Sequence, residues 1–311
     1  MKKINSLIFR NIKMFFKDKG LFFVALITPL ILLVLYTTFL GNVYRDSFVS
    51  TLPQGVTLSD NVINGLVGGQ LLSSLLAVCP ITVAFCSNML MVQDKISGAK
   101  KDFLLTPTKK STMALSYYIS TTICTLIISL FAMVCCFIYL AIVGWYLSFI
   151  DVLALVLDVF LLTMFGTALS SIINHFLSTQ GQISAVGSIV SSCYGFICGA
   201  YMPISTFGTT LQSILGLLPG TYGTALLRNH SLGGVFSEMT SLGIPTQVID
   251  GLKSSIDCNI SLFGANVSIG AMYAIMATTV IVLVGAYILI NYLKKPKKHT
   301  QKQTQTKWFM F

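Results

Sequence analysis

The chain has 311 residues, of which 54% are hydrophobic and only 10% are charged. A soluble domain usually carries roughly 25% charged residues, and so few charges could not cover the surface of a water-soluble protein of this length. The composition therefore excludes a soluble enzyme, a secreted disulfide scaffold and a disordered tail. It indicates a single all-helical membrane domain that crosses the bilayer several times.

The chain lacks the usual signatures of catalysis. It has no G-x-x-x-x-G-K-[ST] phosphate loop, no H-E-x-x-H pair and no C-x-x-C spacing among its 8 cysteines, and its 3 histidines are scattered. We therefore expect neither an enzyme nor a metal or nucleotide site within this chain.

Six apolar runs are each long enough to cross roughly 30 Å of hydrocarbon as a helix. We expect membrane-spanning helices over residues 21–40, 66–91, 112–143, 152–173, 182–201 and 269–293. Residues 203–227 are also uncharged, but Pro203, Pro219 and several glycines oppose a full span. The sequence predicts instead short or re-entrant helices in an outer insert over residues 203–268.

The N-terminal segment, residues 1–19, shows helical periodicity. Its basic residues lie largely away from apolar residues that recur at three- and four-residue steps, namely Ile4, Leu7, Ile8, Ile12 and Phe15. This pattern predicts an amphipathic helix in the membrane interface. The alternative is a solvated basic flank of the first span.

Basic residues set the expected orientation. Of the 20 Lys and Arg residues, only Arg45, Arg228 and Lys253 lie outside the N-terminal segment, the loop 93–110 and the C-terminal tail. Six spans place these three segments on one side, and the positive-inside rule makes that side cytoplasmic. We expect both termini to be cytoplasmic in a cell membrane. The net charge of +10 is then an orientation signal, not a sign of nucleic-acid binding.

Asp158 is an ionisable residue within the fourth expected span. A charge in lipid is costly and often functional, so one hypothesis is an ion-coupled secondary transporter that uses Asp158. The alternatives are an outer-interface carboxylate, or a protonated one that is hydrogen-bonded between helices.

Small residues occupy one face of the fifth expected span: Ser188, Ser192, Gly195 and Gly199. Such a face lets helices approach closely. It fits the seam of a dimer, the wall of a transport path, or ordinary internal packing.

The loop 93–110 carries mixed charges, then an apolar patch, then a Thr-Pro stop at Thr106 and Pro107. This order predicts a short surface helix that presents Phe103 and Leu104 to a soluble partner. The alternative is an ordinary basic cytoplasmic loop.

The loop resembles that of ATP-binding-cassette (ABC) type-2 exporter permeases, an acidic-basic-acidic-x-Gly-Thr run followed by Leu-Leu-x-Thr-Pro. The matching residues are Asp94, Lys95, Gly98, Leu104, Leu105, Thr106 and Pro107, whereas Ile96 and Ala99 depart from the pattern. Residues 199–205 are similar to the family's Pro-Ile-Ser stop after the fifth span. Residues 219–228 are similar to its Pro-x-Thr-Tyr and Arg segment.

The resemblance implies a permease subunit that pairs with a second, identical or sister, permease and with separate ATPase subunits that hold ATP and Mg. Such a pair would export an amphipathic drug, peptide or lipid-like substrate, and we expect a bacterial source. A membrane enzyme or assembly factor is the least favoured alternative. The residues implied in coupling to the ATPase are Asp94, Lys95, Gly98, Phe103, Leu104, Thr106 and Pro107.

Overall fold

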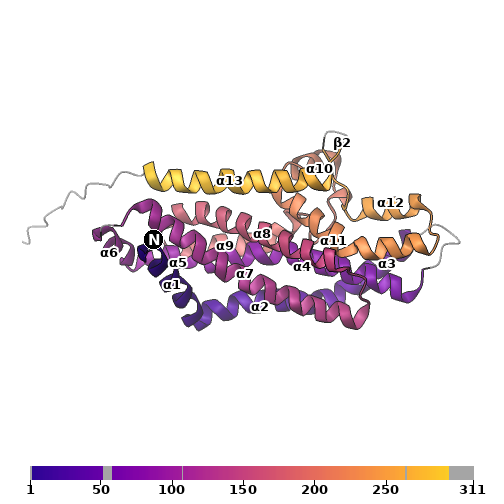
Figure 1. Ribbon diagram of the computed structural model, residues 1–311, viewed down its shortest axis with the longest axis horizontal. Coiled ribbons are helices and arrows are strands. Elements are labelled where there is room, and N and C mark those ends of the chain that lie inside the picture. Colours follow the sequence, from indigo (N-terminus) through magenta and orange to yellow (C-terminus); the bar gives the residue numbers. More distant parts are fainter. Residues whose placement is uncertain (1, 52–57, 107, 263–264, 294–311) are drawn as a thin grey trace, which may run out of the picture.

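Long helices lie side by side along the main axis of the molecule (Figure 1). The computed structural model describes residues 2–51, 58–106, 108–262 and 265–293. The principal lengthwise helices are α2 (Lys19–Leu35), which continues through the π-helix η1 (Tyr36–Leu40) into α3 (Gly41–Thr51), α4 (Asp60–Ser87), α7 (Lys110–Val143), α8 (Phe149–Phe176), α9 (Gln180–Ile197) and α13 (Ile269–Leu293).

Within the described residues, five helical segments are long and apolar enough to cross a membrane. They are Lys19–Ser50, Asp60–Ile96, Lys110–Val143, Phe149–Phe176 and Ile269–Leu293. The prediction of a multi-pass, all-helical membrane protein is therefore confirmed. The run expected at 182–201 folds as α9, but its glutamines, serines and glycines keep it outside this set. The count of six spans stays a prediction.

Helix α4 is the centre of the bundle, and nearly all of its residues are buried. It packs against α2, α7, α8 and α9 as well as against the later helix α11 (Pro219–Ser241). Its glycines allow these close contacts. A Cβ atom on Gly69 would lie 2.8 Å from the carbonyl oxygen of Ser231 on α11, so a larger residue would force the two helices apart.

The N-terminal segment forms the amphipathic helix α1 (Lys2–Lys17). One face packs against α7 and buries Asn11 and Phe15. The other face exposes Phe9 and Lys13. An exposed aromatic ring beside a lysine suits a membrane interface, and that location stays a prediction.

The insert between α9 and α13 is largely helical. It contains η2 (Ile204–Thr206), α10 (Thr209–Leu215), α11, α12 (Thr246–Ser255) and a two-stranded hairpin of β1 (Ser261–Leu262) and β2 (Ala265–Asn266), in which Ser261 pairs with Asn266. Helix α11 differs from the expected short outer helices because it has 23 residues and packs against α4, α8 and α13.

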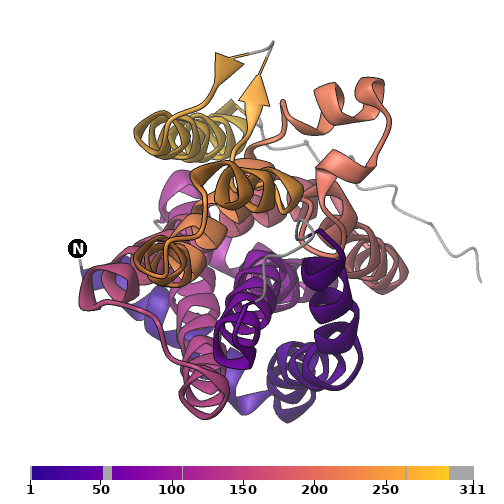
Figure 2. The ribbon, with the colours of Figure 1, turned by 90° about the vertical axis from the view of Figure 1, so that its right-hand side faces the viewer.

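The two ends of the bundle differ in which segments they carry. Helix α1, the helix α6 (Ala99–Leu105) and the last described turns of α13 lie at one end, and α3 and α12 lie at the other (Figure 1). Two of the basic segments, the N-terminal segment and the loop 93–110, therefore lie at the same end, whereas the basic residues of the C-terminal tail lie outside the described residues. Figure 2, a view along the bundle, shows α2, α3 and α9 on the right-hand side of the bundle.

Candidate functional site

The loop between α4 and α7 folds as two short helices joined by a glycine turn. Helix α5 (Met89–Ile96) is followed by Gly98, whose φ of +87° is disfavoured for residues with a side chain. Helix α6 then ends at Leu105, and the hydroxyl of the capping residue Thr106 donates to the carbonyl oxygen of Phe103 at 2.6 Å. This is the short helix that the sequence predicts here.

Asp94 is the buried anion of this loop, with only 3% of its surface exposed. Arg10 on α1 donates from Nη2 to Oδ1 at 2.8 Å and from Nη1 to Oδ2. Tyr117 on α7 donates its hydroxyl to Oδ2 at 2.5 Å. Charge-assisted, two-pronged bonds of this kind are strong and fix orientation. Asp94 therefore ties α5 to α1 and α7, and its carboxylate does not itself face a soluble partner.

Lys95 binds the end of α8. Its Nζ donates to the carbonyl oxygens of Asn174, His175 and Leu177 at 2.7, 2.7 and 2.9 Å. The last carbonyls of a helix lack partners within the helix, and a cation at that end is favoured by the helix dipole. Neighbouring loop residues thus hold two different elements, α1 through Asp94 and α8 through Lys95.

The apolar patch of the loop divides between an inward and an outward residue. Phe103 is half-buried, and its ring centroid lies 5.0 Å from Cζ of Arg10, so it faces inward rather than toward a partner as expected. Leu105 is 87% exposed and is the outward apolar residue. The side chain of Leu104 and all of Pro107 lie outside the described residues.

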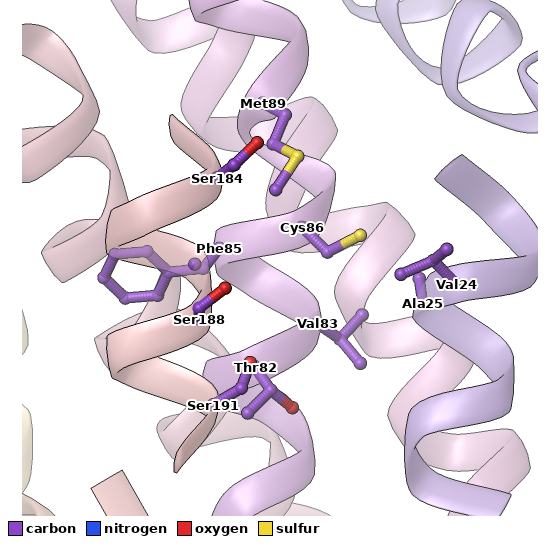
Figure 3. A pocket seen from close by; sticks show the side chains of 11 residues that line it. Val24, Ala25, Thr82, Val83, Phe85, Cys86, Met89, Ser184, Ser188 and Ser191 are labelled. Carbon is purple, nitrogen blue, oxygen red and sulfur yellow. The ribbon is translucent and has the colours of Figure 1, made fainter. Parts of the chain in front are cut away.

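A groove of about 330 Å³ lies between α2, α4 and α9 (Figure 3). Hydroxyl groups of Ser184, Ser188 and Ser191 on α9 line it together with apolar side chains of α2 and α4. Ser188 is the one candidate path residue in this lining. Ser192 is exposed, and its hydroxyl donates to the carbonyl oxygen of Ser188 at 2.7 Å. The mixture of hydroxyl and apolar groups suits an amphipathic ligand.

Gly195 and Gly199 serve the turn after α9 instead of the groove. A Cβ atom on Gly195 would lie 2.3 Å from the ring of Tyr201, so this ring occupies the glycine's free side. Gly199 has a φ of +74°, which ends the helix.

The turn after α9 is held by a buried ion pair. Asp257 accepts a bond from the backbone N–H of Ser205 at 3.1 Å and another from that of Ile204. Nη1 of Arg228, a residue only 1% exposed, lies 3.4 Å from Oδ2 of Asp257, and its Nη2 donates to the carbonyl oxygen of Gly199. The two motif segments, residues 199–205 and 219–228, are therefore in direct contact.

Asp158 lies between three helices. Its Oδ2 is 2.7 Å from Nδ1 of His230 on α11, and its Oδ1 accepts a bond from the hydroxyl of Tyr273 on α13 at 2.6 Å. The structure thus shows the inter-helix, hydrogen-bonded arrangement. Both carboxylate oxygens of Asp158 have protein partners. This arrangement gives no support to an ion-coupled transporter centred on Asp158.

Along the chain, the loop with its glycine turn follows α4, and the turn held by Asp257 and Arg228 follows α9. Motifs in this order are typical of one known family. The family model described as ABC-2 type transporter matches residues 2–230. The chain belongs to the ABC-2 type transporter family. No curated protein and no solved structure matches it.

The matched part of this ABC-2 permease contains α1, the loop, the groove and Arg228. Helix α12, the hairpin and α13 lie beyond residue 230. Two of the partners described above, Asp257 and Tyr273, therefore come from the unmatched part. As an ABC-2 membrane domain, the chain is a transport subunit.

Several residues of the site are not evident from the sequence. Arg10 has a weak signal, because it is an arginine in an otherwise lysine-rich segment and arginine favours two-pronged carboxylate binding. Tyr117, His230, Asp257 and Tyr273 carry no local pattern, since their partners lie far along the chain.

Proposed function

We propose that this chain is the permease subunit of an ATP-driven exporter in the cell membrane, with both termini cytoplasmic. ATP and Mg are bound and used by a separate ATPase subunit. One observation carries the proposal: the ion pair of Arg10 and Asp94 makes α1 and the α5–α6 loop a single unit at one end of the bundle. A unit of that kind can receive force from a soluble partner and pass it to the membrane helices.

The ATPase contacts the outward face of α6. Leu105 is an exposed apolar residue there, and Lys101 and Asp102 are exposed charges; Ile96, at the end of α5, is also exposed. Displacement of α6 reaches α1 through Arg10 and the end of α8 through Lys95. In this mechanism the buried Asp94 and the half-buried Phe103 position the loop, and Leu105 makes the contact.

A second permease, identical or sister, covers α9 and α2. Helix α9 exposes Ser188, Ser192 and Cys193, and exposed hydroxyl groups are poorly accommodated by lipid. A partner at this face would enclose the groove between α2, α4 and α9 and make α9 the sixth crossing. The enclosed path would carry an amphipathic drug, peptide or lipid outward.

The docking proposal is tested by replacing Leu105 with aspartate. We expect Leu105→Asp to abolish co-purification with the ATPase subunit and ATP-driven uptake of substrate into inverted vesicles, while the permease still inserts into the membrane. The matched control is Leu242→Asp, because Leu242 is also exposed but follows α11. Unchanged ATPase binding and export in Leu105→Asp would exclude α6 as the docking element.

The pairing proposal is tested by cross-linking. Cys193 on α9 is exposed, whereas the other seven cysteines are buried or half-buried. A short bis-maleimide should yield a dimer in native membranes that Cys193→Ser abolishes. A dimer of the chain expressed alone indicates an identical partner, and one that requires a co-expressed sister permease indicates a sister. No cross-link in either case would contradict a seam at α9.

A further inference from the structure

The hydrogen-bonded group of Asp158, His230 and Tyr273 joins the insert to the bundle. Asp158 is on α8, His230 on the insert helix α11 and Tyr273 on α13. The imidazole of His230 also stacks on the ring of Tyr273, with ring centroids 6.1 Å apart. One carboxylate thus holds two other helices by side chains alone.

The partners differ in their access to water. The side chain of Asp158 is fully buried, whereas that of His230 is 16% exposed. Helix α11 extends toward the end of the bundle that carries α3 and α12, opposite α1 (Figure 1). Because the His230 side chain is partly exposed, its imidazole can exchange a proton directly, while Asp158 exchanges one only through its partners.

Few other charges face His230. On α8, Asp151 lies toward the same part of α11 and raises the pKa of His230, although less than Asp158 does. Tyr273 is the titratable group from α13. Helix α4 carries one charged residue, Asp60, which pairs with Arg45. On α11 itself, Arg228 is held by Asp257, and Lys253 of α12 lies over the ring of Phe236.

We propose that Asp158, His230 and Tyr273 form a proton-dependent latch that holds α11 against α8 and α13. The latch is closed while His230 is protonated, because an imidazolium then faces a buried carboxylate. Loss of that proton removes the charge attraction and leaves Asp158 as a buried anion with a neutral partner. This inference does not depend on the proposed transport function.

The pKa of His230 gives the direction of the effect. Partial burial lowers this pKa, but the hydrogen bond to Asp158 and the charges of Asp158 and Asp151 outweigh it and raise the pKa above its ordinary value. A histidine with a raised pKa in the folded protein stabilises the fold below its ordinary pKa, near 6.5, and the stabilisation is lost as pH rises through the folded pKa. The latch therefore weakens as the medium becomes alkaline.

Few other groups can produce the same response between pH 6 and pH 9. Histidines, the α-amino group and accessible thiols are the ordinary groups that titrate in that range, and His230→Gln leaves all the other such groups in place. Burial raises the pKa of Cys258, the thiol near α11, to about 12 and thus out of the range. The chain has 3 histidines, and the variant His230→Gln keeps His175 and His299.

The test is the melting temperature of the purified full chain in detergent between pH 6 and pH 9. We expect the wild-type value to fall by roughly 2–4 °C, the response of a chain of this size to the loss of one buried interaction. His230→Gln and Asp158→Asn should flatten this dependence. Tyr273→Phe should lower the melting temperature at every pH but keep the slope, because the titrating pair remains. An unchanged slope in His230→Gln would overturn the proposal.

A second measurement decides the question on the wild-type chain, and a variant serves only to assign the resonance. The 3 imidazoles of the wild-type chain can be labelled with ¹³C and titrated by NMR. One of them should titrate above the ordinary range, and it should be the resonance that Asp158→Asn shifts back. If all three titrate at or below pH 6.5, the latch does not exist.

Discussion

Arg10 and Asp94 are 84 residues apart in the chain, yet two nitrogens of the Arg10 guanidinium bind the two carboxylate oxygens of Asp94. The pair joins the helix before the first span to the loop after the second. Since Tyr117 donates a third bond, a buried carboxylate is fully satisfied by residues of two other helices. The loop therefore has a fixed position relative to α1 before any partner binds.

Replacing Arg10 with alanine should destabilise the chain by about 3–5 kcal/mol, because it leaves Asp94 buried with a single hydroxyl partner. Arg45→Ala is the matched control. Arg45 pairs with Asp60 at the surface, where the two side chains are 41% and 79% exposed, so its removal should cost no more than about 1 kcal/mol. Detergent-solubilised chains are compared by thermal unfolding. Equal losses in the two variants would contradict the distinction between a buried and an exposed pair.

Gly98 should be sensitive to substitution through its backbone alone. A Cβ atom added there meets no atom within 4 Å, but the φ of +87° should make Gly98→Ala cost about 1–2 kcal/mol. Gly251 on α12 also has open space around it, without a positive φ, and Gly251→Ala should instead stabilise the chain by up to about 1 kcal/mol. Unfolding curves of the two variants should shift in opposite directions. Shifts in the same direction would exclude the left-handed turn as the cause.

Lys95→Met should loosen the end of α8. The variant keeps most of the aliphatic stem but leaves three carbonyl groups without the Nζ donor, and we expect a loss of about 1–3 kcal/mol. Lys101→Met, at an exposed position of α6, should change stability by less than about 0.5 kcal/mol. Hydrogen–deuterium exchange near residues 174–177 should rise in the first variant only. Unchanged exchange there would show that the lysine does not hold the helix end.

The long helices could be predicted because apolar length and charge placement act locally along the chain. Expected spans 112–143 and 269–293 agree closely with α7 and α13. Expected span 182–201 extends past the end of α9 because Gly199 adopts a positive φ, which an apolar run does not reveal.

The site could be predicted only in part. The loop, its glycine and its short helix follow from local sequence. The inward direction of Phe103 does not, because it depends on Arg10, a residue on a different helix. Likewise, the hydrogen bonds that hold the turn after α9 depend on Asp257, which belongs to the insert and has no motif around it.

The packing of α11 into the bundle leads to the last prediction, which compares two adjacent glycines. A Cβ atom on Gly234 would lie 1.8 Å from the backbone carbonyl oxygen of Tyr146, in the link between α7 and α8. A Cβ atom on Gly233 would come no closer than 3.7 Å to Oδ1 of Asp151, which is an ordinary contact.

Because a backbone atom cannot move aside as a flexible side chain can, Gly234→Ala must displace α11 and should cost about 3 kcal/mol or more. Gly233→Ala should be neutral or should stabilise the chain by up to about 1 kcal/mol, since alanine favours a helix more than glycine does. The two variants share the same helix and the same added methyl group, so their difference in melting temperature isolates the contact with Tyr146. Similar melting temperatures would show that α11 does not lie against that link.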